Sequence, residues 1–191
     1  MSGKVIVIFV EGQTDEVFYK KICQHLKKNK KPKSKKLFIK NLKGIGNFEK
    51  KACAKIKNEI SPKFPKSDLI IFCAYDTDVF SIPFQQKPPV NWKNLEKKLL
   101  CQGVSKIFHI KAKKMIEDWF LIDAEGICKS LKIKSQKPSG KNGYEKIKNL
   151  FKKANKVYQK GYNINQFVDN LDYDKILSNI KEEISELNKQ L

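Results

Sequence analysis

Acidic residues follow two apolar segments of the chain, and their types and spacing could hold a metal ion. Glu11 comes directly after the run Val5–Val10, while Asp76 and Asp78 come directly after the run Leu69–Tyr75. Carboxylates held close together repel one another unless a cation neutralises them, and hard oxygen ligands select Mg²⁺ or Mn²⁺. Residues two apart in an extended chain point the same way, so we expect the carboxylates of Asp76 and Asp78 to share one side.

The elements that must position these acids form an alternating pattern of strands and helices. The two apolar runs are rich in β-branched residues and do not alternate with polar ones, which is typical of strands buried on both faces. Leu37–Leu42 and Lys106–Ile110 are weaker strand candidates, and apolar residues recur at helical spacing in between. The pattern predicts an α/β fold with a four-stranded parallel sheet between helices. Ligands of such sheets sit beyond the carboxyl ends of the strands, so the acids should share one edge.

Further along the chain, Glu117 is another candidate for the same edge. It follows the strand candidate Lys106–Ile110 and begins a helix that carries Trp119. Its carboxylate could be a metal ligand or a base, or it could be a first-turn acid that stabilises the helix N-terminus. Asp15 is interpreted mainly as a first-turn helix acid, and the sequence leaves the role of Asp118 open.

The charge of the chain points to a polyanionic partner. Forty lysines stand against twenty acidic residues, with no arginine and a net charge of +20. Genome composition explains lysine in place of arginine, but it does not explain the excess over acids. Nucleic acid is the simplest partner, and the lysine-rich ranges 27–43 and 126–160 are predicted to hold its backbone. Lys111, Lys113 and Lys114 lie just before Glu117 and could stabilise charge that develops on a phosphate.

Composition argues against several other classes of protein. The five cysteines form no Cys-x-x-Cys pair and only two histidines accompany them, which excludes a zinc ribbon or a disulfide scaffold. No apolar run approaches the roughly eighteen residues that a membrane span needs. Val5–Val10 is too short for a signal peptide. We therefore expect a soluble, cytoplasmic protein.

The second part of the chain is predicted to be a helical extension, covering residues 126–191 after a first domain at 1–125. Its charge is basic at first and acidic toward the end, and beyond residue 140 it is predicted to be entirely helical. A seam of apolar residues at helical spacing either docks onto the domain or binds a partner, and docking is favoured. The seam consists of Ile176, Ile180, Ile184, Leu187 and Leu191.

The segments VIVIFVEGQTDEVFY and LIIFCAYDTD together resemble the TOPRIM domain, over roughly residues 4–125. The resemblance implies a Rossmann-like, four-stranded parallel sheet in which Glu11, Asp76 and Asp78 hold Mg²⁺ for chemistry on a phosphodiester. The surroundings of Glu11 and the segment Ile116–Asp123 are similar to small RloB-like and abortive-infection TOPRIM proteins, related to OLD-type nucleases. Ser81 is a departure, because the wider family often has glycine there.

This resemblance implies a Mg²⁺- or Mn²⁺-dependent nuclease of bacterial anti-phage defence, with RNA (transfer RNA included) favoured over DNA. Glu11 or Glu117 would accept a proton from the attacking water or position a second ion. In some relatives a separate ATPase takes part. Two alternatives stay open: a housekeeping RNA-processing ribonuclease, and a non-catalytic regulatory subunit that binds nucleic acid or an ATPase.

Overall fold

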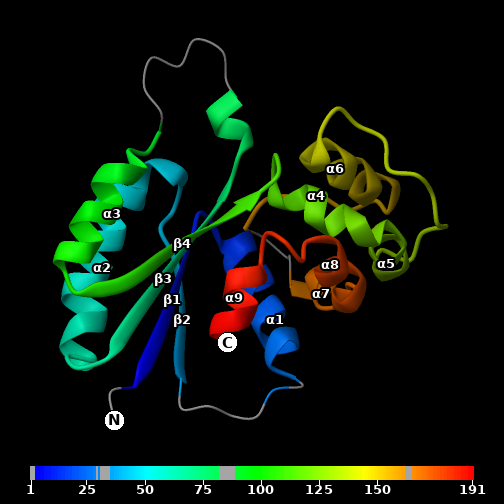
Figure 1. Ribbon diagram of the computed structural model, residues 1–191. Helices are drawn as coiled ribbons and strands as arrows, with labels where there is room; N and C mark the ends of the chain where they lie inside the picture. Colours follow the sequence, from blue (N-terminus) through cyan, green and yellow to red (C-terminus); the bar gives the residue numbers. More distant parts are fainter. Residues whose placement is uncertain (1–2, 29, 31–34, 82–88, 162–164) are drawn as a thin grey trace.

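Four parallel strands form the centre of the protein, as the sequence predicts (Figure 1). The computed structural model describes residues 3–28, 30, 35–81, 89–161 and 165–191. The strands are hydrogen-bonded in the order β2-β1-β3-β4. Their bounds are Lys4–Val10 for β1, Lys35–Asn41 for β2, Asp68–Asp76 for β3 and Val104–Ala112 for β4.

The central strands are buried on both faces because their side chains alternate between two apolar layers. On β1, Ile6, Ile8 and Val10 belong to one hydrophobic cluster, and Val5 and Phe9 belong to the other. Strand β3 divides in the same way between the two clusters. Continuous apolar runs are therefore required here, since a polar residue on either face would be taken out of water.

Helices cover both faces of the sheet (Figure 1). Helices α2 and α3 lie on one side, and α1 lies on the other side together with α4 to α9. The α-helices are α1 Gln13–Lys27, α2 Cys53–Lys55, α3 Trp92–Cys101, α4 Ile116–Phe120, α5 Ala124–Ser130, α6 Gly143–Lys153, α7 Asn165–Val168, α8 Tyr173–Asn179 and α9 Ser185–Gln190. Single turns of 3₁₀-helix are η1 Ile45–Asn47, η4 Ser61–Lys63, η5 Asp78–Ser81 and η6 Leu121–Asp123.

The helical segment between β2 and β3 is irregular. Two π-helical stretches, η2 Phe48–Ala52 and η3 Ile56–Ile60, flank the short α2. Phe48, Ala52, Ile56 and Ile60 are nevertheless all buried against the sheet, as their spacing predicts.

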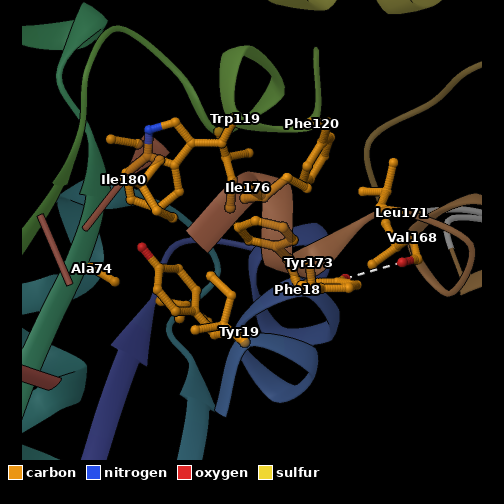
Figure 2. Packing of buried hydrophobic residues seen from close by; sticks show 14 of the residues in the cluster. Phe18, Tyr19, Ala74, Trp119, Phe120, Val168, Leu171, Tyr173, Ile176 and Ile180 are labelled. Atoms are coloured by element: carbon orange, nitrogen blue, oxygen red, sulfur yellow. Dashed lines mark hydrogen bonds between the residues drawn. The ribbon is translucent and has the colours of Figure 1, made fainter. Parts of the chain in front are cut away.

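The C-terminal helices pack onto the same face of the sheet as α1. Figure 2 shows Tyr173 and Ile176 of α8 beside Phe18 of α1 and Trp119 of α4, and the Tyr173 hydroxyl donates a hydrogen bond to the carbonyl of Val168. The whole seam from Ile176 to Leu191 is buried in this cluster. The docking interpretation of the seam is therefore confirmed.

The prediction that the chain is entirely helical beyond residue 140 is wrong after Lys153. Helix α6 ends there because Asn155 takes a left-handed conformation, with φ of 54°. Lys156 N donates to Phe151 O at 2.9 Å and Asn155 N donates to Lys152 O at 3.0 Å, the pattern of a Schellman cap. The chain then runs without helix to residue 161, and this segment reaches the candidate site.

None of the helices in the described part of the chain has the length and apolar character required to cross a membrane.

Candidate active site

Glu11 and Asp76 meet at the carboxyl edge of the sheet. Strand β1 pairs with β2 on one side and β3 on the other, so the order in which successive strands are added to the sheet reverses between β1 and β3. Such a switch point is where open parallel sheets bind ligands. Glu11 follows β1, Asp76 ends β3, and Glu11 Oε1 accepts a hydrogen bond from Asp76 N at 2.7 Å. The structure thus brings two of the predicted site residues together.

Helix α4 brings Glu117 to the same place. Asp76 Oδ1 accepts a hydrogen bond from Ile116 N, the first residue of α4, at 2.8 Å. Glu117 is fully buried, and its Oε1 accepts a hydrogen bond from the Tyr158 hydroxyl at 3.0 Å. A first-turn acid without a further role would face solvent, so the burial of Glu117 favours membership of the site.

Lys160 lies between these carboxylates. Its Nζ is 3.0 Å from Glu117 Oε2 and 3.5 Å from Asp76 Oδ2. Glu117 Oε2 is buried and has no hydrogen-bond partner among the described residues. Its contact with Lys160 is an ion pair. Partial burial opposes the charged form of Lys160, but the carboxylates of Glu117 and Asp76 outweigh it and raise the lysine pKa. Lys160 therefore stays a cation at neutral pH.

Asp15 belongs to this cluster as well as to the start of α1. Its Oδ2 accepts a hydrogen bond from Gly12 N at 2.9 Å, which is the helix-capping role predicted for it. Its side chain is also buried. Burial first, and the charge of Glu11 second, raise the Asp15 pKa to about 7.

Three carboxyl groups of the cluster ionise only near neutral pH. The pKa of Glu11 and of Asp76 is about 7, as it is for Asp15, and burial is the largest cause in each case. Repulsion from Asp15 adds to the effect at Asp76. One ammonium does not offset all these acids, so the site retains a surplus of acidic groups that favours a further cation.

The Asp76-Thr77-Asp78 segment is not extended throughout. Strand β3 ends at Asp76 and Asp78 begins the turn η5, so the alternation rule does not apply to Asp78. Asp78 is partly exposed, and its charge contributes to the raised pKa of Glu11. Thr77 anchors the segment, because its hydroxyl donates to Ala112 O at 3.1 Å and accepts from Lys114 N at 2.8 Å.

The three predicted phosphate-binding lysines lie beside this edge. Lys111 is on β4 opposite Tyr75, and Lys113 and Lys114 follow the end of the strand. All three side chains are exposed. Lys114 O also accepts from Asp78 N at 2.9 Å, so the lysine turn and the acidic segment are joined through the backbone.

Asp118 lies next to the site, at the contact between α4 and α6. Its Oδ2 is buried and has no hydrogen-bond partner in the part of the chain that the structure describes. A side chain at Gly143 would come within 2.9 Å of Asp118 N and Oδ1, so α6 approaches α4 closely here. The position indicates a packing role for Asp118.

A metal ion would find suitable donors here, but the side chains do not surround one. Across the described residues, no group of three or more His, Cys, Asp or Glu is arranged to hold a metal ion. The carboxylates of Asp76 and Glu117 turn toward Lys160 instead. The donor type fits Mg²⁺ or Mn²⁺, and ligation would require these carboxylates to rearrange.

Sequence reasoning missed Tyr158, Lys160 and Thr77. Lys160 is one of forty lysines, so composition gives it no distinction. Tyr158 and Lys160 reach the site because Gly161 N donates to Thr14 Oγ1 at 3.0 Å, which attaches the segment to the start of α1. Thr77 could have been predicted, since it lies between Asp76 and Asp78, two residues of the predicted site.

Comparison with protein-family models, curated proteins and solved structures gave no match to this chain.

Proposed function

We propose that this chain is a Mg²⁺- or Mn²⁺-dependent nuclease of the TOPRIM type, which cleaves phosphodiester bonds in RNA in preference to DNA. The observation that carries the proposal is the meeting of Glu11 and Asp76 at the switch point of the sheet, joined by a hydrogen bond of 2.7 Å. Glu117 lies in the same cluster, and Asp78 lies two residues beyond Asp76.

Glu11, Asp76 and Asp78 are the residues that would hold the metal. In the described part of the chain, only Oε1 of Glu11 takes part in a hydrogen bond, which leaves its second oxygen available. Bound Mg²⁺ or Mn²⁺ would orient the phosphate and lower the pKa of an attacking water.

Other residues of the chain would keep the carboxylates in place and take up protons. Ile116 N fixes one oxygen of Asp76, and the Tyr158 hydroxyl fixes one oxygen of Glu117. Glu11 or Glu117 would accept a proton from the attacking water. Lys160 offsets part of the negative charge.

The positive body of the protein would bind the substrate backbone without reading its sequence. Exposed Lys111, Lys113 and Lys114 lie at the same edge as the acids. Of the lysine-rich range 126–160, Lys160 is paired with Glu117 and Asp76. Residues 29 and 31–34 of the range 27–43 lie outside the described part. A role in bacterial anti-phage defence, transfer RNA as the substrate and a separate ATPase partner remain part of this proposal, through the TOPRIM resemblance.

A second candidate is a non-catalytic subunit that binds nucleic acid or an ATPase. The observation that favours it is the ion pair of Lys160, which already supplies a cation to Glu117 and Asp76. A buried charge cluster neutralised in this way can serve structure alone. A housekeeping ribonuclease would share the site of the main proposal, so substrate choice separates those two.

The test is a cleavage panel with purified protein. End-labelled transfer RNA, single-stranded RNA, single-stranded DNA and plasmid are incubated with Mg²⁺, with Mn²⁺ and with EDTA. We expect metal-dependent cleavage of RNA that Glu11→Ala and Asp76→Ala both abolish. Asp68→Asn is the matched control, because Asp68 lies on the same strand as Asp76 at its opposite end.

Thermal unfolding with and without Mg²⁺ accompanies the panel. Stabilisation by the metal, lost in Asp76→Ala and kept in Asp68→Asn, would support the site even if a partner is needed for cleavage. Absence of both cleavage and metal stabilisation would contradict the nuclease and leave the non-catalytic subunit.

A further inference from the structure

A cavity opens beside the carboxyl end of β3, on the other side from the acidic cluster. It has a volume of about 580 Å³, within the range of roughly 300–1,000 Å³ typical of ligand pockets. Tyr75, Thr77, Phe80, Trp92 and Lys111 are among its lining residues. The metal proposal uses none of the aromatic residues.

Three of the lining residues are aromatic and contact one another. Trp92 and Tyr75 stack with ring centroids 4.4 Å apart and ring planes inclined by 22°. Phe80 completes the group at 5.7 Å from Tyr75, and it is 37% exposed. The Phe80 ring is inclined by 61° to that of Tyr75, which is buried, so the exposed ring of Phe80 is the one that offers a flat surface to a planar ligand.

The rim of this cavity is positive. Lys93 and Lys111 both line it, their side chains are exposed, and neither forms an ion pair within the described residues. Two acids near α3 are engaged elsewhere: Glu49 accepts from Asn91 N and Asn94 Nδ2, and Glu96 contacts His109 Nε2 at 2.9 Å. Lys111 also lines a neighbouring cavity that contains Glu182, Glu183 and Glu186, and it forms no ion pair with them within the described residues. The ligand should therefore combine a planar aromatic part with a negatively charged part.

The cavity and the acidic cluster are neighbours across one strand. Tyr75 and Asp76 are consecutive on β3, so their side chains point to opposite faces of the sheet. Thr77, which lines the cavity, separates Asp76 from Asp78. A chain with a phosphate at the carboxylates could therefore place an adjacent ring in the cavity.

We propose that this cavity binds one unpaired nucleobase of a nucleic-acid strand, stacked on the exposed ring of Phe80 beside Tyr75 and Trp92, while Lys93 and Lys111 hold the flanking phosphates. The identity of the polymer rests on the proposed function. A base in a duplex is already stacked and paired, so the cavity selects single-stranded segments.

The test is equilibrium binding of a fluorescein-labelled single-stranded RNA 12-mer in EDTA, where cleavage cannot occur. Phe80→Leu removes the ring and keeps an apolar side chain, and we expect its dissociation constant to rise by about fivefold or more. Phe80→Tyr should bind as the wild type does. Leu100→Ala, at a 52% exposed apolar residue on α3, is the matched control and should have no effect.

The ligand is varied in parallel. A series of 12-mers carries one abasic position each, and a duplex of the same sequence completes the set. We expect one abasic position to weaken binding to the wild type as much as Phe80→Leu does, with no further loss when the two are combined. Trp92 fluorescence should be quenched by the intact 12-mer, with the signal assigned by Trp92→Phe.

Equal binding by the wild type and Phe80→Leu would overturn the inference, and so would an abasic effect of the same size in both. An RNA affinity that is unchanged by every abasic position would assign the cavity to another ligand, such as an aromatic side chain of a protein. Because the measurement needs no metal, loss of cleavage in the panel and loss of base-dependent binding are separate results.

Discussion

The ammonium of Lys160 lies 3.0 Å from Oε2 of Glu117, a carboxylate that is fully buried. A buried carboxylate is costly unless charge and hydrogen bonds compensate it. Lys160 supplies the charge and the Tyr158 hydroxyl supplies a hydrogen bond to the other oxygen. A segment remote in sequence is therefore part of the acidic edge of the sheet.

Replacing Lys160 should destabilise the fold through this contact. Lys160→Met leaves Glu117 and Asp76 without their cation, and we expect a loss of about 1–2 kcal/mol in the free energy of unfolding at pH 7.5. The loss is smaller than the roughly 3–5 kcal/mol of a fully buried pair, because the lysine side chain is 46% exposed. Urea denaturation measures it.

A double-mutant cycle assigns this loss to the contact. Glu117→Gln in the Lys160→Met background should recover part of the stability, since the uncompensated charge is gone. Lys152→Met, at an exposed position on α6, is the control. Equal losses in Lys160→Met and Lys152→Met would show that the ion pair contributes nothing to folding.

Stability should also depend on pH through the cluster. Glu11, Asp15 and Asp76 have ordinary pKa values of 3.8–4.5 and values of about 7 in the folded protein. The folded state therefore binds more protons than the unfolded state between these limits, so these groups make stability fall as pH rises from about 4 to 7. Above pH 7 their contribution levels off.

Thermal unfolding in EDTA at pH 5.5 and pH 7.5 checks this dependence. The shift in Tm from pH 5.5 to pH 7.5 should be more negative for the wild type than for Asp15→Asn/Asp76→Asn, by about 2 °C or more. The comparison with the variant removes most of the effect of the large net charge, because the double substitution changes a formal charge of +20 by only two. Parallel pH profiles for the two proteins would contradict the raised pKa values.

Thr77 offers a test of the turn that carries Asp78. Thr77→Val keeps the shape of the side chain but removes the hydrogen bonds to Ala112 O and Lys114 N. We expect a loss of about 1–2 kcal/mol in the free energy of unfolding, together with weaker stabilisation by Mg²⁺. Thr77→Ser keeps the hydroxyl and should behave as the wild type in both measurements.

Salt dependence tests the exposed lysines at the end of β4. Replacing Lys111, Lys113 and Lys114 by glutamine should flatten the slope of log K against log salt for single-stranded RNA by about 2, near 0.7 for each lost phosphate contact. Fluorescence anisotropy at several KCl concentrations gives the slope.

The control for this experiment is a triple glutamine variant of exposed lysines between β2 and β3. Its slope should match the wild type, because these residues precede β3 at the opposite edge of the sheet. A similar change of the salt slope in both variants would mean that RNA binds to the overall positive charge, without a specific contact to the lysines at the end of β4. The control positions are Lys57, Lys63 and Lys66.

Much of the sheet and part of the site follow from sequence because they obey local rules. The run Val5–Val10 has no polar residue to place on either face, so it is buried in a parallel sheet. Once the strands are parallel, the residues that follow β1 and β3 must lie at one edge, which brings Glu11 to Asp76. Of the two roles of Asp15, only helix capping could be predicted from sequence, because capping depends on neighbouring residues. Its burial in the acidic cluster depends on contacts with distant segments.

The rest depends on contacts between distant segments. Lys160 and Tyr158 are placed by the left-handed turn at Asn155 and by the contact of Gly161 with Thr14, and no periodicity encodes either. The alternation rule used for Asp78 fails because β3 stops at Asp76, where Thr77 joins the backbone to the end of β4. Such features require the packed structure.

The place of residues 158–161 in the chain also has a consequence for the order of events during translation. Glu11, Asp76 and Glu117 leave the ribosome well before Lys160, so the strands can pair while the acidic edge still lacks its lysine and its tyrosine. Any nascent chain that has not yet reached residue 158 therefore has an incomplete edge while it is attached to a ribosome, a large body of RNA. For a protein proposed to cut RNA, the site is therefore completed only after residues 158–161 have been synthesised and have left the ribosome.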